Sequence, residues 1–241
     1  MNKLKTALLK LVKEKPLVKV YSHPRSGTHF LEAFLAKNFY KKKDLKIEEI
    51  AWGHWSNRKI KKEGNLYGKL FGNHYFANRN TNDQPKIYIY RDGRAVAYSI
   101  WKTPNFLNKE DSKLSFNAFL NTKIDWQGTP SLKVDPKLTI FEHWSQHFIS
   151  WRGMADKNDN ILMIRYEDLK DHPYEVYKKI HAKFFKKQQL LLPNEIDEIS
   201  KPLGLLPNQG IKDAWKEQIE LRNNDVYKAL VLKNNIDYEL K

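Results

Sequence analysis

The chain has 241 residues, with 43 lysines and arginines against 28 aspartates and glutamates, so its formal net charge is +15 at pH 7. It contains no cysteine, which excludes disulfides, thiol catalysis and cysteine-ligated zinc and favours a cytoplasmic location. The excess charge indicates an anionic partner, but it does not choose among nucleic acid, acidic lipid, a glycan and a multiply charged cofactor.

The length suits one domain with a substantial core, and residues 1–241 show no linker-like stretch or internal repeat. Residues 1–15 are basic and partly apolar, with the spacing of a peripheral amphipathic helix that docks on the domain or touches an anionic surface. Lys10 and Lys13 interrupt their apolar run before it reaches the length of a signal peptide. We also expect no transmembrane segment, since no apolar run is long enough.

A short apolar segment, 17–21, precedes a loop of basic, hydroxyl and glycine residues, and a helix is predicted to follow. The helical pattern is carried by Phe30, Leu31, Phe34 and Leu35. Between strand and helix, residues 24–28 read Pro-Arg-Ser-Gly-Thr. Backbone N–H groups at a helix N-terminus bind anions, and Gly27 allows a ligand to approach the backbone. The loop therefore predicts a phosphate or sulfate site; the alternative is a simple helix cap by Ser26 or Thr28.

A second strand and helix follow the same plan. Residues 41–73 mix lysines, aromatic residues and glycines, and we expect them to wall a pocket. Segment 86–90 is a predicted strand, Arg91 stands at its end, and Ser99 lies eight residues further on the predicted helix. A core does not require this pair, so a strand-end arginine here indicates a second anion site.

The second half of the chain continues the alternation of strands and helices. Prolines and Gly128 interrupt residues 102–137, which we expect to form an excursion with a short helix near 116–121. The remaining predicted elements are a core helix over 138–155, a strand over 161–165, and helices over 174–185, 194–200 and 214–232. The sequence therefore predicts an α/β fold, a single domain with a mainly parallel central sheet flanked by helices. Ligands of such sheets bind at the carboxyl ends of the strands, where Arg25, Arg91 and Tyr166 would lie.

In these features the chain resembles the sulfotransferases that use 3′-phosphoadenosine 5′-phosphosulfate (PAPS). In that family, a Pro-Lys/Arg-Ser-Gly-Thr loop binds the 5′-phosphosulfate, and a strand-end arginine with a serine at the same spacing binds the 3′-phosphate. The resemblance implies a P-loop-like phosphosulfate-binding loop, with PAPS as co-substrate and adenosine 3′,5′-bisphosphate (PAP) as product. It assigns the following residues to the nucleotide: Arg25, Ser26, Gly27 and Thr28 at the sulfonate end, Arg91 and Ser99 at the 3′-phosphate, and Phe30 at the adenine.

Three further contacts are expected. His29 flanks the loop, where a cation would favour the anion. Tyr166 begins a Tyr-Glu-Asp-Leu segment that places a tyrosine near adenine in the family. Segment 208–216 matches a family motif in Gly210, Trp215 and Lys216, but Asn208 and Gln209 replace its basic pair. Gln209, Gly210 and Lys212 are therefore expected to give a weaker grip on the 3′-phosphate.

The resemblance also proposes His74 as the catalytic base, because many members carry a histidine just upstream of this strand. Histidine suits that role at neutral pH, although a hydrogen-bonded structural histidine is the alternative. Arg25 is assigned electrostatic stabilisation of the leaving group. Glu32 is a poorer base candidate, because its neighbours are expected to be helix surface. His143 and His147 have i, i+4 spacing but no evident third ligand, so we expect no metal.

Taken together, the sequence predicts a sulfotransferase that moves a sulfuryl group from PAPS to a hydroxyl or amine of a carbohydrate or small alcohol, as a monomer or homodimer. A small-molecule or glycan acceptor is expected, and no specific nucleic acid. One alternative is a polyanion-binding or nucleic-acid-binding module on a P-loop-like fold. The other is a nucleotide kinase, which is disfavoured because residues 24–28 lack the second glycine and the Lys-Ser/Thr of that signature.

Overall fold

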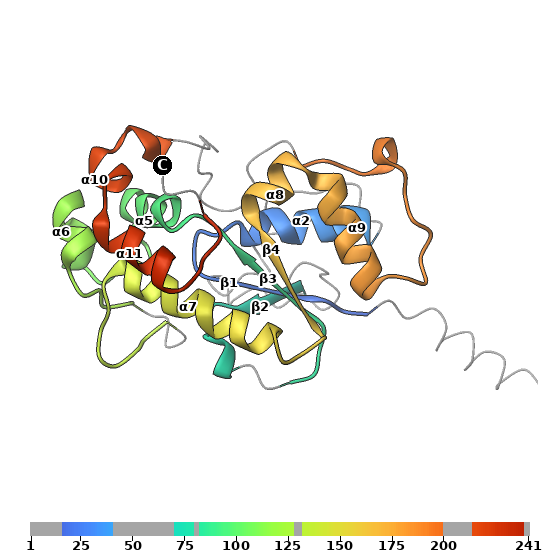
Figure 1. Cartoon of the computed structure of the whole chain (residues 1–241), viewed down its shortest axis with the longest axis horizontal. Helices are drawn as coiled ribbons and strands as arrows, with labels where there is room; N and C mark the ends of the chain where they lie inside the picture. The colour runs from blue at the N-terminus through green and yellow to red at the C-terminus, as the bar shows by residue number, and fades with distance from the viewer. Residues whose placement is uncertain (1–15, 41–69, 80–81, 128–131, 200–213, 239–241) are drawn as a thin grey trace, which may run out of the picture.

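The computed structural model describes residues 16–40, 70–79, 82–127, 132–199 and 214–238. A sheet of four parallel strands lies at its centre in the order β2-β1-β3-β4 (Figure 1). The strands are β1 (Lys19–Ser22), β2 (Phe71–Asn73), β3 (Lys86–Tyr90) and β4 (Ile161–Arg165). The predicted α/β class with a parallel sheet is therefore confirmed, and β2 is a strand that the sequence analysis did not predict.

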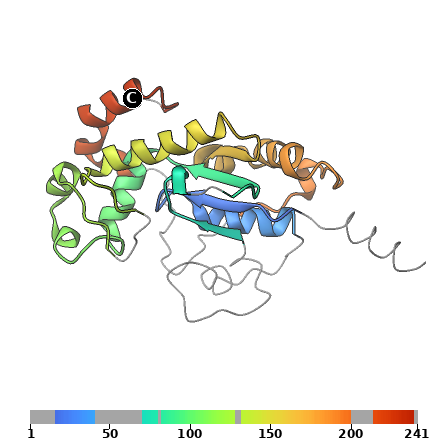
Figure 2. The same ribbon diagram turned by 90° about the horizontal axis from the view of Figure 1, so that it is seen from below.

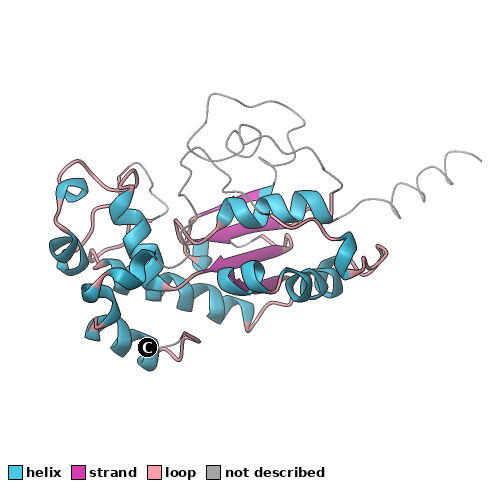
Figure 3. Ribbon diagram, turned by 90° about the horizontal axis from the view of Figure 1, so that it is seen from above, coloured by secondary structure: helices cyan, strands magenta, loops and turns pink. Residues whose placement is uncertain are grey.

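Helices cover both faces of the sheet (Figures 2 and 3). The α-helices are α2 (Thr28–Asn38), α5 (Gly93–Lys102), α6 (Phe116–Asn121), α7 (Ile140–Ala155), α8 (Tyr166–Asp171), α9 (Pro173–Phe184), α10 (Ile219–Arg222) and α11 (Asp225–Lys233). Short 3₁₀ turns lie at Ala77–Arg79, Asp111–Lys113, Pro193–Glu195 and Ala214–Glu217. Helices α5, α6, α10 and α11 gather at one end of the molecule, on the left in Figure 1.

The alternation of side chains along the strands divides the core in two. Ile87 and Ile89 of β3 pack with the aliphatic residues of α2 and α9. Tyr88 points to the opposite face, where it joins the aromatic residues of α7, and its ring stacks on Trp151 with the centroids 5.2 Å apart. The predicted core stripe of α7 is confirmed, because Phe141, Trp144, Phe148 and Trp151 are all buried.

Two helix predictions in the last third of the chain are wrong. Residues 196–199 are not helical, because Asn38 of α2 binds the backbone N–H and carbonyl of Asp197 at 2.8 and 3.0 Å. These bonds to α2 replace the intrahelical bonds that a helix would need. The predicted helix over 214–232 is instead a 3₁₀ turn followed by α10 and α11, since the Asn224 side chain caps a new start by accepting from the Tyr227 N–H.

The expectations for residues 1–15 and most of the predicted pocket wall, 41–69, lie outside the described residues. Within the described ranges, no helix combines the length and the apolarity needed to cross a bilayer.

Candidate active site

The loop between β1 and α2 has a backbone that only certain residues tolerate. Arg25 has a φ of 66° and Gly27 a φ of 94°, both in the left-handed region. A Cβ atom at Gly27 would lie 2.3 Å from Cδ2 of Tyr166, so glycine here relieves both the backbone strain and a steric clash. The ends of the loop are joined by a 2.6 Å hydrogen bond between the hydroxyls of Ser22 and Thr28.

Polar atoms of this loop are buried without protein partners, as expected of a site that binds an anion. The Ser26 hydroxyl and the Nε of Arg25 are both inaccessible and make no hydrogen bond within the described structure. Nη2 of Arg25 donates to the Thr103 carbonyl and to Oδ1 of Asn105, each at 3.1 Å. Burial, together with the positive charge of Arg91, lowers the pKa of Arg25 to about 10. A negatively charged ligand would supply the missing hydrogen-bond acceptor and offset this repulsion.

Arg91, Tyr166 and Phe30 meet beside the loop. Nη1 of Arg91 donates to the Arg25 carbonyl at 3.4 Å, and its guanidinium lies 4.8 Å from the centroid of the Tyr166 ring. The rings of Phe30 and Tyr166 are 5.7 Å apart and nearly perpendicular. Ser99 is buried on α5, the helix that follows Arg91. Residues far apart in the sequence are therefore brought to the carboxyl edge of the sheet, as the order of the motifs predicted.

His74 follows β2 and lies against the same loop. Its Nδ1 is 2.8 Å from the Ser22 carbonyl, a contact in which the ring nitrogen must carry the proton and donate it. In that neutral tautomer the lone pair is on Nε2. Burial, with smaller contributions from the nearby His29 and Arg25, lowers the pKa of His74 to about 4. His74 therefore enters the site as a neutral imidazole that can accept a proton.

Glu32 does not lie among helix-surface residues, and that expectation is wrong. Its carboxylate is buried on the inner face of α2, where Oε2 lies 3.1 Å from Nδ1 of His29 and Oε1 has no hydrogen-bond partner. Burial raises the pKa of Glu32. The helical spacing 29–32 was a signal for this pair, since residues three apart lie on one face.

Three further buried histidines, His23, His143 and His147, lie within hydrogen-bond distance of backbone carbonyls, and their rings contact one another. His143 donates from Nε2 to the Leu132 carbonyl at 2.7 Å, and its Nδ1 lies 3.0 Å from Nε2 of His23. His147 accepts from the Tyr88 hydroxyl at 2.8 Å and donates to the His74 carbonyl at 3.1 Å. Among the described residues, no group of three or more histidines and acids is placed to hold a metal ion. These imidazoles pack against one another, and His147 joins them to the backbone of His74.

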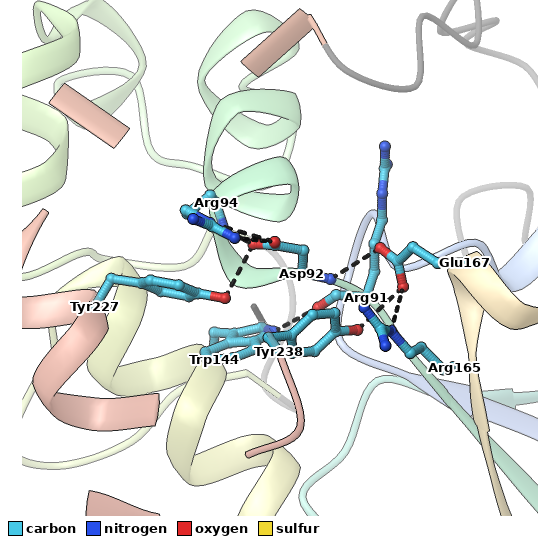
Figure 4. A network of polar contacts seen from close by, with 8 residues as sticks. All are labelled: Arg91, Asp92, Arg94, Trp144, Arg165, Glu167, Tyr227 and Tyr238. Carbon is cyan, nitrogen blue, oxygen red and sulfur yellow. Dashed lines mark hydrogen bonds and ion pairs between the residues drawn. The ribbon is translucent and has the colours of Figure 1, made fainter. Parts of the chain in front are cut away.

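A polar network that was not predicted from the sequence includes Asp92 and Glu167, the residues directly after Arg91 and Tyr166 in the chain (Figure 4). Asp92 and Glu167 are linked by a 3.2 Å bond from the Asp92 N–H to Oε1 of Glu167. The signal was an acidic residue directly after each predicted contact. Gln209, Gly210 and Lys212 lie outside the described residues.

The sequence and the fold match those of known proteins. The family model for the sulfotransferase domain matches residues 74–226, which is more than half of the chain. An amine sulfotransferase of Oryctolagus cuniculus is 25% identical over 224 residues, which cover 86% of this chain and 69% of that protein. Sulfotransferase 2A1 of Rattus norvegicus is 27% identical over 205 residues, 79% of this chain and 66% of its own length. The chain thus spans about two thirds of the length of these relatives.

The fold is also found in a solved structure, the mouse sulfotransferase SULT7A1 complexed with PAP. It superposes with a TM-score of 0.57 at 17% sequence identity, and the match covers 94% of this chain and 87% of that one. The chain belongs to the sulfotransferase domain family, whose members are PAPS-dependent enzymes of sulfuryl transfer. The predicted family is therefore confirmed, and the polyanion-binding module and the nucleotide kinase are not favoured.

Proposed function

We propose that this sulfotransferase binds PAPS between the 22–28 loop and Arg91 and transfers its sulfuryl group to an amine or hydroxyl, with His74 as base. The observation that carries the proposal is the buried hydroxyl of Ser26, which has no hydrogen-bond partner among the described residues and lies in a left-handed loop beside two arginines. A buried hydroxyl without a hydrogen bond lowers the stability of the ligand-free protein, and a hydrogen bond to a ligand would offset that loss.

The residues divide by what they would hold. Arg25, Ser26, Gly27 and Thr28 suit the 5′-phosphosulfate, since they combine a cation with hydroxyls and with N–H groups at the start of α2. Arg91 and Ser99 suit the 3′-phosphate, and the perpendicular rings of Phe30 and Tyr166 suit an adenine. His29 adds a partly exposed imidazole next to the loop, held by Glu32.

The chemistry then follows from the protonation states of the side chains. PAPS supplies the sulfuryl group and a phosphate leaving group. His74, fixed by the Ser22 carbonyl, accepts the proton of the attacking amine or hydroxyl on its Nε2. Arg25 stabilises the negative charge that develops on the leaving side, and it does so without giving up a proton. Anionic groups at the loop would oppose the positive charges that depress the pKa of His74, and so raise it toward neutrality.

The acceptor is proposed as a small amine or alcohol, including that of a sugar. The relatives include an amine sulfotransferase, which supports nitrogen as well as oxygen as the attacking atom. His74 lies 6.0 Å, centroid to centroid, from Phe106, whose ring also faces the Arg25 guanidinium at 5.7 Å. An aromatic face beside the base and the leaving-group arginine favours an acceptor with an apolar or ring surface.

The test is transfer of labelled sulfuryl from PAPS to a panel of small amines, alcohols and sugars, with the wild type and His74→Asn. We expect His74→Asn to lower kcat at least about a hundredfold, the usual contribution of a general base, while the Kd of PAP stays within about threefold. His172→Asn, which changes an exposed histidine where α8 meets α9, is the matched control and should keep full activity. Equal kcat for His74→Asn and the control would remove His74 from the mechanism, and no transfer by the wild type to any acceptor would contradict the proposed function.

A further inference from the structure

The two residues proposed to contact the nucleotide are tied to each other through their neighbours in the chain. The Asp92 N–H donates to Oε1 of Glu167 at 3.2 Å, which joins the carboxyl ends of β3 and β4. The Arg91 carbonyl accepts from Nε1 of Trp144 at 3.0 Å. The backbone that carries Arg91 is therefore held from two sides, by Glu167 of α8, the helix that follows β4, and by Trp144 of α7 (Figure 4).

Asp92 also binds the C-terminal part of the chain. Its Oδ1 accepts from the hydroxyl of Tyr227 on α11 at 3.0 Å, and its Oδ2 accepts from Nη2 of Arg94 at 2.7 Å. All three side chains are almost fully buried. A buried carboxylate whose partners are a cation and a phenol makes strong bonds, because no water competes for it.

Glu167 makes a second, parallel link to the same segment. Its Oε2 accepts from the hydroxyl of Tyr238 at 3.2 Å and lies 3.4 Å from Nε of Arg165. The Tyr238 ring lies beneath the Arg165 guanidinium, 4.5 Å from its centre. Each acid thus receives one tyrosine hydroxyl from residues 225–238, as Figure 4 shows.

The same network reaches the point where the C-terminal segment enters the described structure. The Arg94 guanidinium lies between two aromatic rings, 4.2 Å from that of Trp215 and 4.9 Å from that of Tyr227. Trp215 comes just after residues 209–212, for which the sequence analysis predicts contacts to the 3′-phosphate. Asp92 therefore links the packing of residues 214–238 to the position of Arg91, its neighbour in the chain.

We propose that Asp92 and Glu167 are positioning residues, which set Arg91 and Tyr166 for the nucleotide through their bonds to Tyr227 and Tyr238. This inference rests on the proposed function. It makes nucleotide affinity depend on two hydroxyls that touch no ligand, and by reciprocity it makes docking of residues 214–238 tighter when the nucleotide is bound. The coupling passes through identified hydrogen bonds and not through distance alone.

The experiment measures the Kd of PAP by calorimetry for the wild type, Tyr227→Phe and Tyr238→Phe. Each change removes one hydroxyl and keeps the ring, so the contacts with Arg94 and Arg165 remain. The control is Tyr174→Phe on α9, which deletes a hydroxyl that donates to the Leu191 carbonyl at 3.2 Å. We expect the Kd to rise about threefold to tenfold in each network variant and to stay at the wild-type value in the control. Thermal unfolding without ligand is recorded for all four proteins, so that folding losses are measured separately.

Steady-state kinetics add a readout that a merely structural role would not move. The network variants should show a higher KM for PAPS, with kcat at saturating PAPS and the KM of the acceptor nearly unchanged. If both variants bind PAP like the control, Asp92 and Glu167 serve only the fold and the inference is overturned. If the wild type itself does not bind PAP, the proposed function fails first and the inference falls with it.

Discussion

The 22–28 loop and the Asp92–Glu167 network lie at the same edge of the sheet, but they differ in how completely their buried polar groups are hydrogen-bonded. In the network, every carboxylate oxygen accepts a hydrogen bond of 3.2 Å or shorter, and Nε of Arg165, which makes no hydrogen bond among the described residues, still lies 3.4 Å from a carboxylate oxygen of Glu167. In the loop, the hydroxyl of Ser26 and the Nε of Arg25 are buried and make no hydrogen bond to any residue that the structure describes. Buried polar groups normally have hydrogen-bond partners, so this difference is the one that the proposal requires between a loop that binds the nucleotide and a network that positions its contacts.

The largest expected effect on activity comes from adding a side chain at Gly27, where the Tyr166 ring leaves no room for one. Gly27→Ala would place a methyl group 2.3 Å from the Tyr166 ring at a φ of 94°, and it should lower kcat/KM for PAPS about a hundredfold or more by displacing the loop. Gly153→Ala is the matched control, because a Cβ there meets nothing within 4 Å. That control sits within α7 and should stabilise the protein by about 0.5 to 1 kcal/mol at full activity. Equal kinetics for the two variants would show that the loop backbone is not part of the site.

The buried histidines His74 and His143 make the stability of the protein depend on pH, with a definite sign. Burial lowers the pKa of both His74 and His143 to about 4, below the value near 6.5 of the unfolded chain. The unfolded state therefore binds more protons as the pH falls, and stability present above about pH 6.5 is lost progressively down to about pH 4. We expect a loss of about 2 kcal/mol for each of these histidines between pH 7 and pH 5.

Urea unfolding at these two pH values measures this loss. Replacing His143 by glutamine, which retains a donor for the Leu132 carbonyl, should make the loss smaller. A free energy of unfolding that is the same at pH 7 and pH 5 would contradict the neutral, buried state assigned to these side chains.

A smaller effect distinguishes a hydroxyl that binds the ligand from one that stabilises the fold, because the two should change PAP affinity and protein stability differently. Ser26→Ala removes a hydroxyl without a partner, so it should leave the ligand-free protein equally stable or raise its stability by up to about 1 to 2 kcal/mol. The same change should weaken PAP binding about tenfold, the value of a hydrogen bond to a charged ligand. Ser22→Ala, which breaks the 2.6 Å bond to Thr28, should instead lower the stability of the free protein. Loss of stability in Ser26→Ala would mean that its hydroxyl serves the fold.

Local patterns were enough to predict much of the fold and which residues lie at the candidate nucleotide site. The strand of 161–165, the helix of 116–121 and the core stripe of α7 follow from periodicity, and the positions of Arg25 and Arg91 follow from the rule that strand ends meet at one edge. The motifs placed Arg25, Arg91 and Tyr166 at the carboxyl ends of the strands, but the close approach of Tyr166 to Gly27 is seen only in the structure.

The features that were missed depend on contacts between distant segments. The bonds of Asn38 to Asp197, 159 residues away, abolish the helix expected at 194–200. The burial of Glu32 against the core depends on which face of α2 meets the sheet. The partners of Asp92 and Glu167 come from the C-terminal segment, and no local pattern could have indicated that Tyr227 and Tyr238 reach the ends of β3 and β4.

The measurement that tests the central claim most directly is thermal unfolding with and without PAP, for the wild type, Arg91→Ala and Arg222→Ala. The last variant removes an exposed arginine of α10 and so matches the loss of charge. At a hundredfold excess over its Kd, PAP should stabilise the wild type and Arg222→Ala by about 2.7 kcal/mol. Arg91→Ala should lose most of that gain. Equal stabilisation of Arg91→Ala and Arg222→Ala, or none in the wild type, would contradict a nucleotide site at this edge of the sheet.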